Sequence, residues 1–183
     1  MKDLKETELV QLARQGDQDA FCTLYGLYKD RYFRYAYYRL HDATDAEDAV
    51  ADAVTAMWQQ IPGLKAPGAF GTWSFRILSG CCAKLIRQQI QARGQSSVEA
   101  LSEAGVQIPG DPGDDAAAGT MDLRLILEQT LATLAEDERE LVLLSVVGGL
   151  NSNEISEVTG LTPGGVRSKL SRSLKKMRTQ LEG

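Results

Sequence analysis

The sequence is poor in the residue types that carry metal, redox and disulfide chemistry. Its 183 residues include one histidine, His41, and three cysteines, Cys22, Cys81 and Cys82. A single histidine excludes a histidine metal cluster, and the cysteines lack the spacing of a structural zinc site. Their odd number and the adjacent pair make a poor disulfide framework. We therefore expect no cofactor and no metal, and reduced cysteines packed as small hydrophobic residues in a cytoplasmic protein.

Long apolar runs and catalytic motifs are also lacking. The longest apolar stretch, residues 141–147, contains Ser145 and is far too short to cross a bilayer. The first ten residues are charged and have no apolar signal-peptide core. The chain has no phosphate-binding loop, nucleophile elbow or catalytic triad pattern. We expect a protein that is not an enzyme, takes no small-molecule substrate and does not insert into membranes.

The net charge is −5, but it is unevenly distributed. Residues 161–183 hold six basic residues against one acidic residue, whereas residues 94–160 are strongly acidic. A DNA-binding protein that acts alone is normally basic overall. The pattern therefore favours a protein that contacts nucleic acid through its C-terminal segment, after assembly with a larger partner.

Helical periodicity recurs along the chain, and no segment shows the alternation of a strand. We expect an all-α fold with two small helical domains, residues 1–93 and 123–183. Between them, residues 94–122 are rich in Gly, Pro, Ser and Asp, which is typical of a flexible acidic linker, with a short helix at 98–104. The expected helices cover residues 7–14, 17–40, 44–61, 69–91, 123–134, 138–147, 151–160 and 162–181.

Capping residues mark several of these helix starts. Asp17, Thr44 and Asn151 precede helical patterns, and the last two are followed after three residues by glutamate, as in a capping box. Thr162 stands before Pro163, a favoured first helical residue. The apolar face of the helix at 69–91 is predicted to comprise Phe70, Trp73, Ile77, Cys81 and Leu85.

Residues 151–178 have the layout of a helix-turn-helix, in which the second helix enters the major groove. Val166, Leu170 and Leu174 are expected to face inward, together with Ser173, Met177 and Leu181. The outer face then carries Arg167, Ser168, Lys169, Ser171, Arg172 and Lys175. Arginine and lysine there suit guanine edges and phosphates. The alternative is an ordinary solvated amphipathic helix.

The whole chain resembles a known family. The run LNSNEISEVTGLTPGGVRSKLSRSLKKMR is similar to the last DNA-binding domain of bacterial RNA polymerase sigma factors. The runs AFCTLYGLYKDRYFRYA, DAEDAVADAVTAMW and FGTWSFRILSGCCAKLIRQQ resemble their polymerase-binding domain. Since only a linker separates the two, the resemblance is to the compact extracytoplasmic-function (ECF) group.

The resemblance implies partners and site residues. Core RNA polymerase, through the coiled coil of its β′ subunit, and promoter DNA are the expected partners, and an anti-sigma factor is a further candidate. The residues expected to bind polymerase are Asp48, Asp52, Thr55 and Gln59. Those expected to recognise the −10 element and open the strands are Phe70, Trp73, Phe75, Arg76 and Arg87. Those expected to recognise the −35 element are Thr162, Arg167, Ser168, Lys169, Ser171, Arg172 and Lys175. Arg167 and Arg172 are expected to read bases in part, and Lys169, Lys175 and Lys176 to contact phosphates.

Several of these roles have simpler alternatives. The face that carries Asp48, Asp52, Thr55 and Gln59 could be an ordinary solvated acidic face. Phe70 and Trp73 could be core residues, and for Trp73 we favour this alternative. The chain also departs from the family, which usually has Asn at the position of Gly80 and Asp near that of Lys84, so the family's −10 recognition does not carry over through these two positions.

Two other functions fit parts of the pattern. One is a stand-alone helix-turn-helix regulator whose N-terminal helices form a sensor or dimerisation domain. The other is a helical adaptor that binds only proteins. The net acidic charge disfavours the regulator, because such a protein would bind DNA without help.

Overall fold

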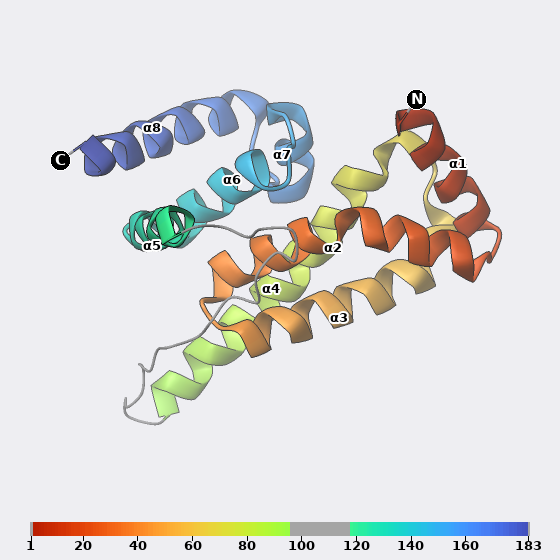
Figure 1. Ribbon diagram of the computed structural model, residues 1–183, viewed down its shortest axis with the longest axis horizontal. Coiled ribbons are helices and arrows are strands. Elements are labelled where there is room, and N and C mark those ends of the chain that lie inside the picture. Colours follow the sequence, from red (N-terminus) through yellow and green to blue (C-terminus); the bar gives the residue numbers. More distant parts are fainter. Residues whose placement is uncertain (1, 96–117, 183) are drawn as a thin grey trace. The chain divides into compact units, whose positions relative to one another are not determined.

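The computed structural model describes residues 2–95 and 118–182, and all regular secondary structure in these ranges is helical, which confirms the all-α expectation. The chain divides into two compact units, Met1–Glu99 and Ala100–Gly183. In Figure 1 the first unit runs from red to light green and the second from green to blue. The expected helix at 98–104 and most of the linker fall on residues 96–117, outside the described residues.

The first unit contains α1 (Lys2–Arg14), α2 (Gln18–Leu40), α3 (Ala43–Gln60) and α4 (Phe70–Gln95), with two short 3₁₀ turns between α3 and α4. The second unit contains α5 (Ala118–Ala132), α6 (Glu136–Val146), α7 (Ser152–Thr159) and α8 (Pro163–Glu182). α4 and α5 therefore both extend into the stretch expected as linker.

Helix caps account for most of the boundaries. The Asp17 carboxylate accepts a hydrogen bond from Ala20 N at 3.1 Å, so the cap of α2 is confirmed. The expected cap of α3 at Thr44 is wrong, because Asp42 caps the helix by accepting from Asp45 N at 2.9 Å. Asp and Thr are both good N-caps, so residue preference alone does not choose between these two positions.

Aromatic side chains form the core between α2 and α4. The Phe75 ring lies 5.2 Å from the Tyr32 ring and 5.7 Å from the Tyr35 ring, in edge-on contacts that aromatic pairs prefer. Phe70 packs on Tyr28 at 5.4 Å. Phe75, Tyr32 and Tyr35 are at most 1% exposed. This cluster fixes how α4 is rotated about its axis.

A buried cation adds a polar contact to the same interface. Arg39, 5% exposed, donates from its guanidinium to the Tyr35 hydroxyl at 3.0 Å and to the Ser79 carbonyl at 3.3 Å. A buried charge is tolerated only when hydrogen bonds replace its lost hydration. Arg39 therefore joins the end of α2 to the middle of α4.

The face of α4 that enters the core differs from the predicted one. Phe75, Leu78 and Cys82 are fully buried, whereas Trp73 and Ile77 are half-buried. Phe70 is buried as predicted, but from Trp73 onward the predicted stripe is displaced by about one residue, or about 100° around the helix. Long-range contacts with the tyrosines of α2 select the observed face, and local periodicity does not reveal them.

Substitution of adjacent residues distinguishes the two faces. Leu78→Ala is expected to lower the free energy of unfolding of the first unit by about 2–5 kcal/mol, because it leaves a cavity in a sealed core. Ile77→Ala should cost roughly 1 kcal/mol, since its side chain already meets solvent. Both tryptophans lie in this unit, so urea unfolding followed by tryptophan fluorescence measures it selectively. An equal or larger loss for Ile77→Ala would contradict the observed packing.

Candidate nucleic-acid interface

One polar surface lies on α3. We call it the α3 polar stripe: Asp48, Asp52, Thr55 and Gln59, all exposed. The opposite face of α3 is closely packed, with Ala46, Ala49 and Ala53 fully buried. None of the stripe carboxylates is needed to fill the core, so the stripe is a surface that another protein can contact at little cost to folding.

The cysteines lie in three different environments. Cys22 is exposed, Cys81 half-buried and Cys82 buried, so the expectation of buried cysteines is wrong for Cys22. All three are free thiols. Burial and the nearby Asp52 carboxylate raise the pKa of the Cys81 thiol, which keeps it protonated and poorly nucleophilic.

A basic surface runs along α4. Its exposed members Arg76, Gly80, Lys84 and Arg87 recur at helical spacing, and we call them the α4 basic face. Trp73, half-buried against Phe70 with ring centroids 5.8 Å apart, lies next to this face. A side chain at Gly80 would meet no atom within 4 Å, so the backbone there is bare to solvent.

The structure brings together only part of the predicted −10 residue set. Arg76 and Arg87 lie on the α4 basic face, and Trp73 lies beside it. Phe70 and Phe75 instead belong to the core, with 2% and 0% of their surfaces exposed. Their burial corrects the expectation that these two rings stack on opened bases, because neither ring has a face open to solvent.

The second unit contains the expected helix-turn-helix. α7 starts with a capping box in which Asn151 accepts from Glu154 N and the Glu154 carboxylate accepts from Asn151 N, both at 2.9 Å. Gly160 ends the helix with φ of +82°, a conformation that favours glycine. Thr162 then caps α8 by accepting from Gly165 N at 3.0 Å.

Gly165 is explained by this cap. A Cβ there would lie 3.0 Å from the Thr162 hydroxyl oxygen, which is too close for an ordinary contact. Thr162 remains exposed, and a hydroxyl that accepts one hydrogen bond can also donate one. The expected contribution of Thr162 to DNA binding is therefore compatible with its role as a cap.

α8 presents three different sides. Val166, Ser173 and Met177 are buried against the rest of the unit. Leu174 and Leu181, expected in the core, are 39% and 54% exposed, which corrects that assignment. Within α8 itself, the exposed polar residues of the predicted −35 set are Arg167, Ser168, Ser171, Arg172 and Lys175.

The third side of α8 carries lysines that are already paired. The Lys169 ammonium donates to the Asp137 carboxylate, and the Lys176 ammonium lies 3.5 Å from Glu138. These pairs join α8 to the first turn of α6. Lys169 is therefore set apart from the other predicted DNA-binding residues. The sequence suggested its basic character but not its acidic partner 32 residues earlier.

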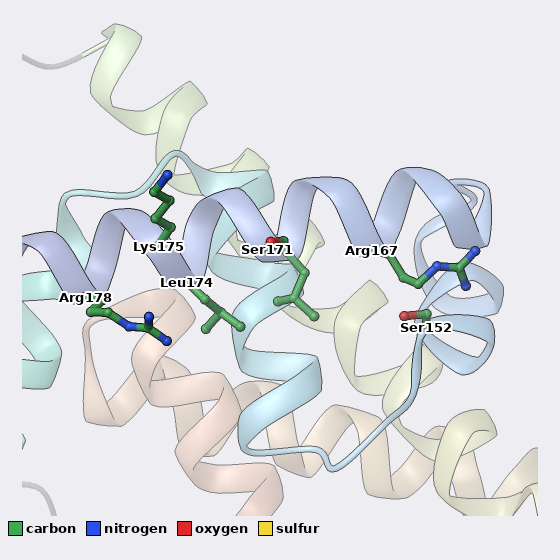
Figure 2. Close-up of a pocket in the computed structure, with 7 residues that line it drawn as sticks. Ser152, Arg167, Ser171, Leu174, Lys175 and Arg178 are labelled. Carbon is green, nitrogen blue, oxygen red and sulfur yellow. The ribbon is translucent and has the colours of Figure 1, made fainter.

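A groove of about 460 Å³ runs beside the exposed side of α8. Its lining comprises Ser152, Arg167, Leu170, Ser171, Leu174, Lys175 and Arg178. Figure 2 shows Arg167 near Ser152, at the start of α8, and Lys175 pointing away from Leu174 and Arg178. Arg178 and Ser152 were not predicted as site residues. Arg178 follows Lys175 by three residues, and this spacing is the signal that could have identified it.

Residues 2–95 and 118–182 contain neither a metal-binding cluster nor a membrane-spanning helix. These residues include no group of three or more His, Cys, Asp and Glu placed to hold a metal ion. Nor does any helix in the described part of the chain combine the length and apolar character needed to span a membrane.

Family comparisons match both units. Residues 24–91 match the model for sigma-70 region 2, and residues 124–177 match the model for sigma-70 region 4. The ECF RNA polymerase sigma factor SigW of Bacillus subtilis is 24% identical over 94% of both chains. The sigma factor SigE of Mycolicibacterium smegmatis is 29% identical over 91% of this chain and 64% of its own.

Solved structures show the same fold. CnrH, solved in complex with the cytosolic domain of CnrY, aligns with a TM-score of 0.71 over 97% of both chains at 22% identity. The sigma factor RpoE from Bartonella quintana, solved with the anti-sigma factor NepR, aligns with a TM-score of 0.67 over 88% of this chain and 96% of its own at 19% identity. Because region 2 and region 4 occur in order and the ECF relatives align over nearly the full length, this chain belongs to the ECF family of RNA polymerase sigma factors.

Proposed function

We propose that this chain binds core RNA polymerase and directs it to promoter DNA, with the α3 polar stripe on the polymerase, the α4 basic face on the −10 element and the exposed side of α8 on the −35 element. The observation that carries the proposal is the separation of an acidic surface on α3 from basic surfaces on α4 and α8. Each has the charge suited to its partner.

The chain supplies recognition rather than chemistry. Its exposed clusters are charged side chains suited to docking and to phosphate binding, and the protein acts with the polymerase in the cytoplasm without catalysing a reaction itself. An anti-sigma factor is included among its partners, because RpoE, one of the similar sigma factors, was solved in complex with the anti-sigma factor NepR.

Net charge governs the order of assembly. A chain with a charge of −5 is repelled by DNA at long range, whereas the basic side of α8 is attracted to it at short range. Promoter binding therefore follows polymerase binding. A stand-alone regulator would bind its DNA without polymerase, so gel filtration of the chain with DNA, with and without core polymerase, separates the two functions.

Charge reversal on α3 tests the polymerase contact. Asp48→Lys and Asp52→Lys are each expected to weaken binding to core polymerase about tenfold, which corresponds to about 1.4 kcal/mol. Both residues are exposed and lie outside the core, so circular dichroism should not change. Asp30→Lys, an equal charge change at an exposed position on α2, is the control and should bind as the parent does. Unchanged affinity in both stripe variants would remove this face from the interface.

Loss of single cations on α4 tests the −10 contact. Arg76→Gln and Arg87→Gln are expected to slow promoter opening by the assembled polymerase, because each removes a cation that holds the displaced strand. Potassium permanganate footprinting of unpaired thymines measures the opening directly. Lys29→Gln, on the exposed surface of α2, removes the same charge elsewhere in the unit. If it slows opening as much as the α4 variants do, the α4 basic face has no special role.

Adjacent lysines on α8 provide a matched pair for the −35 contact. Lys175→Ala should weaken binding of the holoenzyme to all duplexes alike and lower the salt slope by about one unit. Lys176→Ala should change little, because Lys176 is paired with Glu138. Arg167→Ala should cost about 1–3 kcal/mol and relax preference at one base pair.

The probe for these titrations is a duplex that the parent holoenzyme selects from a randomised library, followed by fluorescence anisotropy at several salt concentrations. Equal effects of Lys175→Ala and Lys176→Ala would show that the exposed side of α8 is not the DNA-binding side.

A further inference from the structure

Lys169 occupies an unusual place on α8. It lies between Arg167 and Arg172 in sequence, yet it is turned toward α6, where its ammonium donates to the Asp137 carboxylate. Arg172 follows Arg167 by five positions, so their side chains point about 140° apart around the helix. Lys169 follows Arg167 by two positions and therefore lies on the far side of the helix from it. The helix thus carries a cation on its flank that the free protein has already neutralised.

The pair is built from exposed groups. The side chains of Lys169 and Asp137 are 30% and 56% exposed, so water reaches both and the lysine chain has room to turn. Hydrogen bonding from Lys169 holds the pKa of the Asp137 carboxyl below its usual range, and Asp137 is therefore charged at neutral pH. An exposed pair of this kind contributes little to stability.

We propose that Asp137 competes with the DNA backbone for Lys169 and thereby lowers the affinity of this sigma factor for any duplex. The proposal rests on the proposed contact between α8 and DNA. In the parent the Asp137 carboxylate keeps the Lys169 ammonium when α8 meets a duplex, so the parent forms one phosphate contact fewer than the cations of α8 would allow. Asp137 thus sets how many cations of α8 are available to DNA.

The neighbouring ion pair, Glu138 with Lys176, does not control how many cations are available to DNA. Glu138 accepts from Ala135 N at 3.0 Å at the start of α6 and from the Ser173 hydroxyl at 3.4 Å, in addition to its contact with Lys176. It therefore holds α6 and α8 together. Asp137 holds Lys169 with one carboxylate oxygen, while the other accepts from Glu138 N at 3.0 Å.

Because the two carboxylate oxygens of Asp137 have different partners, a nearly isosteric substitution can remove one contact and keep the other. Asp137→Asn keeps an oxygen for Glu138 N and removes the charge that holds Lys169. In the full chain assembled with core polymerase, we expect the variant to bind DNA more tightly, with a salt slope steeper by about 0.9. The gain should be about threefold larger at about 50 mM than at about 200 mM salt. It should be equal for the selected duplex and for a scrambled one, because phosphates carry no sequence.

Two controls separate the pair from a general change in charge. Glu136→Gln removes the same charge one residue away, where the carboxylate lies 3.6 Å from Arg139 of α6 itself, and should leave the slope unchanged. In a Lys169→Gln background, Asp137→Asn should have no effect, since the coupling runs through Lys169.

The outcomes are distinct. A slope for Asp137→Asn equal to that of the parent, or an equal gain for Glu136→Gln, overturns the proposal while leaving promoter binding intact. A gain that persists in the Lys169→Gln background also overturns it, because Asp137 would then repel DNA directly. Failure of the parent holoenzyme to bind either duplex in a salt-dependent way overturns the −35 function itself, and this proposal with it.

Discussion

The contact of Phe75 with Tyr32 and Tyr35 decides the direction of every exposed side chain on α4. Successive residues of a helix point about 100° apart, so a ring held at 5.2 Å and 5.7 Å from two buried tyrosines fixes the rotation of the whole helix. With Phe75 inside, Arg76 and Arg87 lie outside. Arg39 adds a hydrogen bond to the Ser79 carbonyl and holds the middle of α4 in the same rotation. The basic face is thus a consequence of aromatic packing on its opposite side.

In the second unit, a different set of contacts fixes the rotation of α8 about its axis. Val166 and Met177 anchor α8, and the Thr162 cap fixes where the helix begins. Glu138, in the first turn of α6, contacts Lys176 and the Ser173 hydroxyl on one flank of α8. Because Glu138 serves both the helix start and Lys176, the acidic residues of α6 take part in folding and in the charge balance of α8 at once.

Local sequence signals predicted the helices well. The features that could not be predicted depend on contacts between residues far apart in the sequence. Asp17 and the Asn151 capping box depend on residues three apart, and both were found as expected. Asp42 caps α3 instead of Thr44, two residues further on, because the Asp42 carboxylate accepts from Asp45 N. The α4 face was misplaced because two overlapping apolar stripes exist on that helix, and only the tyrosines of α2 choose between them. The pairing of Lys169 with Asp137 joins residues 32 apart and has no periodic signature.

Gly80 lies in the middle of an exposed helix face, where a side chain would meet nothing within 4 Å. An alanine there would be favoured by about 1 kcal/mol in helix propensity, so packing and stability both argue against glycine. Gly80→Ala is therefore a substitution that should raise the thermal stability of the first unit. The replacement would place a methyl group over the one stretch of bare backbone between Arg76 and Lys84. At this position higher helix stability and open access to the helix backbone exclude one another, and glycine provides the access.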